Sequence, residues 1–156
     1  MNVWFTGAGE QIAYEDIIEI IAKHTINNGK VFIGTDSFNL KTKTVFANAI
    51  CLHGAINARG GRYFIRKTSV SSKNFPNLVT RMLSEVEKTI EIALDISNKV
   101  VEADIELHLD ISASSKNNGT SRFAELLTGY AKSTGFECKI KPYAFAAASV
   151  ADKHSK

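Results

Sequence analysis

Two periodicities divide the chain into expected helices and strands. Apolar residues recur at helical spacing in four segments, and in five others they alternate with polar residues or form short runs. The expected helices cover about 14–28, 77–98, 120–135 and 144–152. The expected strands cover 30–36, 44–53, 62–68, 104–111 and 136–141.

The order of these elements favours an α/β fold. Short polar turns join the first three strands, which therefore pair as an antiparallel meander. Helices precede the fourth and fifth strands, and such crossovers make both parallel to the first if they share its sheet. We expect a five-stranded mixed sheet, three antiparallel strands followed by two helix-linked parallel strands, with helices on both faces. The 156 residues suit a single domain over 1–156, with the helix at about 14–28 preceding the first strand.

Composition is that of an ordinary soluble globular protein, with 44% hydrophobic and 22% charged residues. No segment is apolar enough to span a bilayer and no basic-then-apolar leader pattern is present, so we expect a cytoplasmic location. Cys51 and Cys138 lie in apolar runs without metal-ligand spacing, which is typical of buried thiols in a reducing compartment. The net charge of +3 permits nucleic-acid binding but does not specify it.

The first expected strand ends in a charge. Its apolar run from Val31 to Gly34 is followed by Thr35, Asp36 and Ser37. A carboxylate at the edge of a core is costly unless a partner compensates its charge. A metal ion is one such partner, and a turn or helix-cap aspartate is the simpler alternative. The strand at 104–111 repeats the pattern, because His108 and Asp110 alternate with its apolar residues and a polar loop follows.

Five blocks of sequence carry a resemblance to a known family. They are Phe32–Ser37, Arg62–Phe64, Glu106–Asp110, Lys139–Pro142 and Ala147–His154. In number and order they resemble the YkuK-type family of predicted RNase H-like nucleases, within the ribonuclease H-like superfamily. The resemblance runs from the first strand to the end of the sequence and implies the RNase H-like fold.

The resemblance also implies an active site. In RNase H-like nucleases a cluster of carboxylates holds two divalent cations, Mg²⁺ or Mn²⁺, and a metal-bound water hydrolyses a nucleic-acid phosphodiester. Carried over by position, the ligands are Asp36, Glu85, Asp110 and Asp152. Helical periodicity instead places Glu87 closer to the core edge, so Glu85 and Glu87 both stay open. If the first and fourth strands are adjacent and parallel, as in that fold, Asp36 and Asp110 lie side by side.

Several further residues are candidates for supporting roles. Ser37, His108, Lys153 and His154 could support the ligands or contact phosphate, whereas a structural histidine and a solvated basic segment are the simpler interpretations. A rim for phosphate contact is expected from Lys41, Lys43, Arg59, Arg62, Lys116 and Arg122, and scattered solubilising charge is the alternative.

Two other functions remain open from the sequence. An RNase H-like protein could bind nucleic acid, or regulate, with little or no cleavage. The alanine-rich C-terminal segment could also serve protein interaction. The sequence shows no nucleophile elbow, Walker phosphate loop, dinucleotide fingerprint or zinc spacing, so other common enzyme classes have no support.

Overall fold

The computed structural model describes residues 3–56, 60–112 and 118–155, and it leaves the side chains of 112, 118–122, 147, 148 and 155 undescribed. The predicted rim residues Arg59 and Lys116 lie outside this range, as does the side chain of Arg122. The strands are β1 (Trp4–Thr6), β2 (Gln11–Ile12), β3 (Lys30–Asn39), β4 (Lys43–His53), β5 (Arg62–Ser71), β6 (Asp104–Ser112) and β7 (Glu137–Lys141). The helices are α1 (Tyr14–Ile26), η1 (Ser72–Asn74), α2 (Leu78–Lys99), α3 (Asn118–Lys132), the π-helical η2 (Ala146–Ala151) and α4 (Asp152–Ser155).

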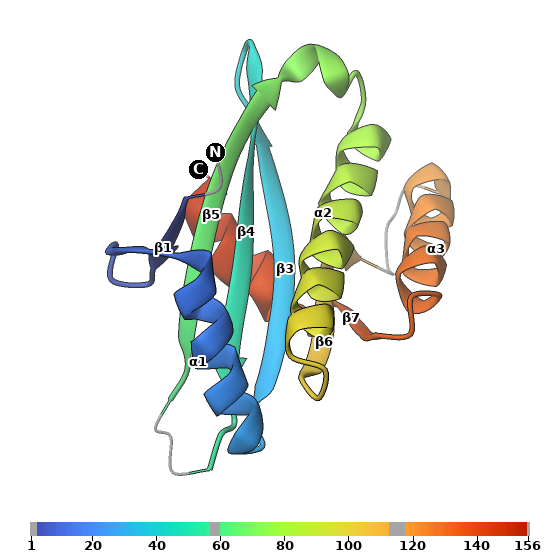
Figure 1. The fold of residues 1–156 in the computed structure, drawn as a ribbon. Helices are drawn as coiled ribbons and strands as arrows, with labels where there is room; N and C mark the ends of the chain where they lie inside the picture. The colour runs from blue at the N-terminus through green and yellow to red at the C-terminus, as the bar shows by residue number, and fades with distance from the viewer. Residues whose placement is uncertain (1–2, 57–59, 113–117, 156) are drawn as a thin grey trace.

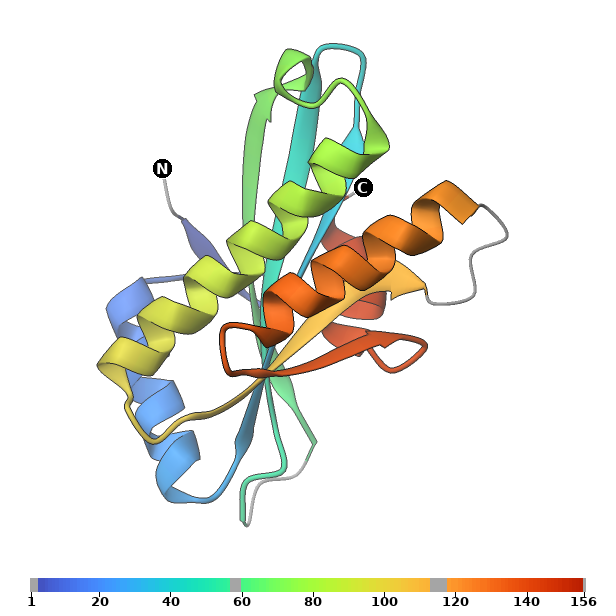
Figure 2. The same ribbon diagram turned by 90° about the vertical axis from the view of Figure 1, so that its right-hand side faces the viewer.

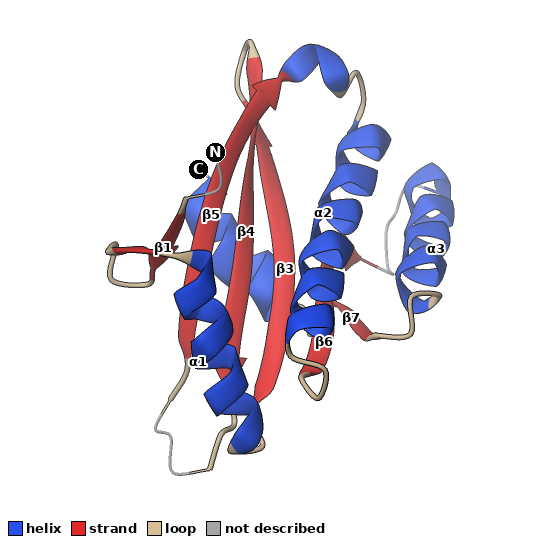
Figure 3. Cartoon of the chain, viewed as in Figure 1, coloured by secondary structure: helices blue, strands red, loops and turns tan. Residues whose placement is uncertain are grey.

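All seven strands form one sheet in the order β2-β1-β5-β4-β3-β6-β7. The meander β3-β4-β5 is antiparallel, and β6 and β7 extend it with parallel pairing, as the connections predicted. Figure 1 shows the long meander strands side by side, and Figure 3 shows how helices connect the later strands.

The expected count of five strands is wrong, because β1 and β2 add to the sheet beside β5. Trp4 pairs with Arg66 in β5 and with Ile12 in β2, and its side chain is buried. These strands of three and two residues are too short for alternation to reveal them. They form because burying one tryptophan on the shared core compensates the cost of ordering a short segment.

The two faces of the sheet are covered differently. The main core lies between the sheet and α1, α2 and α3, where Ile33, Phe64, Val86 and Leu107 are buried together. A smaller cluster on the other face holds Ala146 and Ala151 of η2 against β4 and β5. In Figure 2, α2 and α3 lie in front of the sheet and the red C-terminal segment lies behind it. Helices therefore flank both faces, as predicted.

Candidate metal centre

Asp36 and Asp110 stand where two neighbouring strands cease to pair. The parallel ladder between β3 and β6 ends at Gly34 and His108. Asp36 and Asp110 each follow two residues later, so continued register would place them opposite each other. Beyond His108 the pairing of β6 with β7 also becomes irregular. Beyond Gly34 and His108, the two strands that carry the aspartates are no longer paired with each other.

Glu85 approaches the two aspartates from α2. The helix begins after Asn77, whose side chain accepts a hydrogen bond of 2.9 Å from the backbone N–H of Thr80. From there Met82, Glu85 and Thr89 recur at helical spacing on the buried face. One ligand oxygen each of Asp36, Glu85 and Asp110 lies within 4.8 Å of the others. The structure thus brings together three of the four carboxylates that the sequence predicted.

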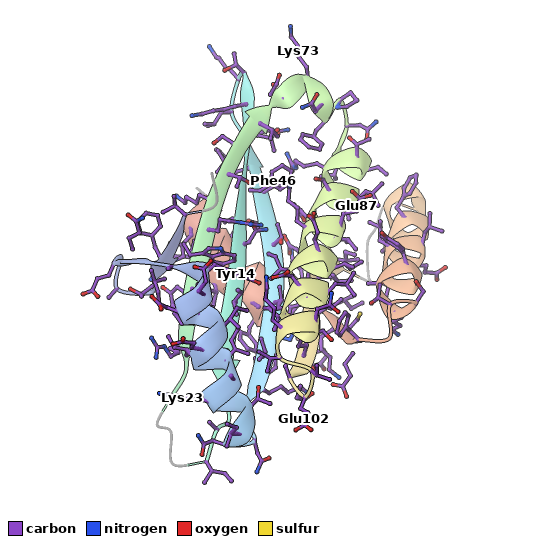
Figure 4. The ribbon with its side chains drawn as sticks, viewed as in Figure 1. Tyr14, Lys23, Phe46, Lys73, Glu87 and Glu102 are labelled. Atoms are coloured by element: carbon purple, nitrogen blue, oxygen red, sulfur yellow. The ribbon has the colours of Figure 1, made fainter. Side chains whose placement is uncertain are left out.

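Glu87 is exposed and does not belong to this cluster; Figure 4 shows its position on α2. The periodicity argument that favoured it was wrong because it centred the helix face on apolar residues alone. Leu83 and Leu94, two apolar residues of this helix, are 36% and 46% exposed, while the polar Glu85 and Thr89 are buried. The buried face of α2 therefore differs from the face that its apolar residues alone define.

Burial sets the protonation of Glu85. Desolvation raises the pKa of its carboxyl from 4.5 to about 8, and the nearby charges of Asp36 and Asp110 raise it further, against a hydrogen bond from Ser37. The Ser37 hydroxyl donates to Oε2 of Glu85. At neutral pH the three carboxyls therefore do not carry three full charges unless a cation joins them. Ser37, predicted as a supporting residue, contacts Glu85 directly.

A lysine that the sequence analysis did not single out completes the cluster. Nζ of Lys141, at the end of β7, lies 2.7 Å from Oδ1 of Asp110. That contact raises the pKa of Lys141, and the charges of Asp110, Asp36 and Asp152 add to the effect. The signal was available in strand alternation, because Cys138 and Ile140 pack on the main core and so turn Lys141 to the opposite face with Asp110.

Asp152 lies near the cluster without joining it. It begins α4, which packs against β3, and its charge acts on the Lys141 ammonium. Among the residues that the structure describes, however, Asp152 is not part of the group whose ligand atoms lie within 4.8 Å of one another. Its predicted role as fourth ligand stays a prediction.

His154 and Lys153 follow on α4. Nε2 of His154 lies 3.1 Å from the Tyr63 hydroxyl of β5, and the two rings are 5.5 Å apart. Burial and the charges of Lys153 and Lys67 lower the pKa of His154. Lys153 is exposed. The histidine thus fastens α4 to β5, and the predicted phosphate contact of either residue stays a prediction.

His108 has a structural environment. Its Nδ1 accepts the backbone N–H of Ala146 at 3.1 Å, and its Nε2–H donates to Glu106 at 2.7 Å. The ring is 1% exposed and contacts Phe32 and Phe145, with centroids 5.1 and 4.7 Å away. Desolvation lowers its pKa, against the hydrogen bond and charge of Glu106. Both ring nitrogens are engaged, so His108 anchors the start of η2. This environment agrees with the simpler of its two interpretations, a structural histidine.

A buried polar chain supports β3 from behind the site. Oγ1 of Thr35 accepts from Asn48 Nδ2 and from Thr89 Oγ1, each at 2.9 Å. Asn48 in turn accepts from Arg66 Nε at 3.0 Å. These bonds tie β3 to α2 and to the two next strands, and they fix the backbone immediately before Asp36.

The donor set fits a hard divalent cation. Three carboxylate oxygens converge, and Mg²⁺ and Mn²⁺ prefer such ligands over nitrogen or sulfur. Burial and the neighbouring carboxylates raise the pKa of Glu85, and a bound cation would favour its charged form. Of the predicted rim cations within the described range, Lys41, Lys43 and Arg62 are exposed.

Comparison with known proteins agrees with this geometry. No curated protein and no solved structure matches the chain. In the described part of the chain, no helix is long and apolar enough to cross a membrane. The family model described as "Ribonuclease H-like" matches residues 12–156. That span includes β3, α2 and β6 with all three clustered carboxylates, and the YkuK-type resemblance refers to the same family. The chain belongs to the ribonuclease H-like family.

Proposed function

We propose that the protein is a metal-dependent nuclease that hydrolyses phosphodiester bonds of nucleic acid. The observation that carries the proposal is the buried convergence of Asp36, Glu85 and Asp110 at the point where β3 and β6 separate. The ribonuclease H-like family includes nucleases, and this placement of carboxylates suits their chemistry. Nucleic acid, whether DNA, RNA or hybrid, is the substrate class that follows.

In this proposal each residue has a defined task. Asp36 and Asp110 supply ligands from rigid strands, and Glu85 supplies one from the helix, oriented by Ser37. Asp152 is the fourth proposed ligand. Bound Mg²⁺ or Mn²⁺ would supply a more acidic water and charge stabilisation for the leaving oxygen. The family resemblance predicts two such ions.

The protein also has to exclude competing partners from the cluster. Glu85 is 8% exposed and Asp36 is 5% exposed, so a bulky cation cannot reach them without displacing core residues. One small ion could contact all three carboxylates, because their ligand atoms lie within 4.8 Å of one another. Because Glu85 must lose its proton when an ion binds, ion binding and proton release are coupled.

The test is a cleavage panel with matched variants. Labelled single-stranded DNA, duplex DNA, single-stranded RNA and RNA–DNA hybrid are incubated with Mg²⁺, Mn²⁺ or chelator. We expect metal-dependent cleavage that falls by roughly a hundredfold or more in Asp36→Asn and Glu85→Gln, because each removes a metal ligand. Glu87→Gln is the matched control, two residues along the same helix and exposed, and it should cleave as the unchanged protein does.

Two outcomes would count against the proposal. Cleavage that persists in chelator would assign the activity to other chemistry. Binding of nucleic acid without cleavage of any substrate in either metal would favour the alternative of a nucleic-acid-binding or regulatory protein. The third possibility, an interaction module built on the C-terminal segment, predicts neither binding nor cleavage of nucleic acid.

A further inference from the structure

The carboxylate cluster already contains one cation. The Lys141 ammonium lies 2.7 Å from Oδ1 of Asp110. The charges of Asp36 and Asp152 also act on it, although each comes from a different element of the fold. Lys141 of β7 thus contacts Asp110 of β6, and the charges of Asp36 in β3 and Asp152 in α4 favour its charged form.

The lysine is directed to this place by the strand that carries it. Ser112 of β6 pairs with Lys141 of β7, so the lysine lies beside the strand end that carries Asp110. Cys138 and Ile140 face the main core, and this alternation turns Lys139 and Lys141 to the other face. The long side chain then needs no distortion of the sheet to reach the carboxylates.

Two positions for positive charge can be distinguished in the cluster. One lies among Asp36, Glu85 and Asp110, whose ligand atoms are within 4.8 Å of one another. The other lies beside Oδ1 of Asp110, where the ammonium of Lys141 is 2.7 Å away. Both positions share Asp110. A carboxylate has two oxygens, so Asp110 can bind Lys141 through Oδ1 and still offer an oxygen to an ion.

We propose that Lys141 supplies the second positive charge of the site, so that one divalent ion completes it where the family resemblance predicts two. The inference rests on the proposed metal site and specifies its stoichiometry. An ammonium adjacent to the cluster repels a second divalent ion and already compensates the charge that such an ion would compensate. Lys141 is a positioning residue here, since it holds Asp110 and excludes the other ion.

The experiment counts ions on the substrate-free protein. Mn²⁺ binding is measured by isothermal titration calorimetry and by electron paramagnetic resonance of free Mn²⁺, at a pH where the site is fully loaded. The unchanged protein should bind one ion. Lys141→Met removes the charge and keeps the length of the side chain, and it should bind two. Lys141→Arg keeps the charge and should bind one.

Lys139→Met is the matched control, because Lys139 lies on the same strand and face, and it should bind one ion. Thermal unfolding in chelator verifies that each variant is folded, and Lys141→Gln serves if the methionine variant is not. Two ions on the unchanged protein, or one ion on both it and the charge-removing variant, would overturn the role of Lys141 while leaving a metal site. No Mn²⁺ on any variant would instead refute the proposed metal site, and the inference with it.

Discussion

Replacing Glu85 by glutamine should stabilise the metal-free protein at high pH. Burial raises the pKa of Glu85 from 4.5 to about 8 in the folded state, whereas the unfolded chain keeps the ordinary value. Between these two pH values the folded state binds a proton that the unfolded state has lost. The free energy of unfolding therefore falls as pH rises from about 4.5 to 8, and the penalty is complete above that range.

The size of the effect follows from the same shift. Raising the pKa from 4.5 to about 8 corresponds to roughly 5 kcal/mol of lost stability at pH 9, and to almost none at pH 4. Glutamine has the shape of the neutral acid, and its carbonyl can still accept the Ser37 hydroxyl. Relaxation of the site will reduce the figure, so we expect Glu85→Gln to gain roughly 3 kcal/mol at pH 9.

Urea unfolding in chelator, repeated from pH 5 to pH 9, measures this effect. The unchanged protein should lose stability across the range, Glu85→Gln should lose much less, and the two should be nearly equal at pH 5. Glu87→Gln, which is exposed, should follow the unchanged protein throughout. If the curves of Glu85→Gln and the unchanged protein run parallel, the carboxyl is not held neutral by its surroundings and the reasoning is refuted.

Two further predictions concern contacts that hold the site in place. Asn48→Ala leaves Arg66 Nε without its acceptor inside the protein, so it should lower the free energy of unfolding in urea by roughly 2–3 kcal/mol. The control Asn98→Ala, on the exposed side of α2, should change little, and equal losses in both variants would show that the buried hydrogen-bond chain does not contribute to stability. Tyr63→Phe removes the hydrogen bond between the Tyr63 hydroxyl and His154, and it should cost about 1 kcal/mol of stability. Amide exchange in α4 should become faster while β3 stays protected. Unchanged exchange in α4 would show that this hydrogen bond does not hold α4 in place.

Long periodic elements could be predicted from the sequence because each carries enough residues to show its period. α1 was expected at about 14–28 and is observed over Tyr14–Ile26, and α2 was expected at about 77–98 and is observed over Leu78–Lys99. The end of the first predicted strand was less accurate. β3 continues to Asn39, past the expected end at 36, because it stays paired with β4 as far as Asn39.

The residues of the candidate site differed in how well the sequence predicted them. Asp36 and Asp110 were found because a charge at the end of an apolar strand conflicts with its neighbours in sequence. Glu85 came only from the family resemblance, since helical periodicity favoured the exposed Glu87. Lys141 was missed because strand alternation shows only which face of β7 it occupies, while its place beside Asp110 depends on the pairing between β6 and β7. Whether such a residue belongs to the site depends on contacts between strands that are distant in the sequence.

The cluster is held in place by contacts that do not require an ion. Ser37 fixes Glu85, and Lys141 fixes Asp110. The buried chain through Thr35 ties the strand before Asp36 to the neighbouring elements. Ligands preset in this way need little rearrangement when an ion binds, and that is how a site keeps three carboxyls close despite their repulsion. In the proposed function, the stability that Glu85 costs at high pH serves cation binding, since a fold optimised for stability alone would place a neutral side chain at that position.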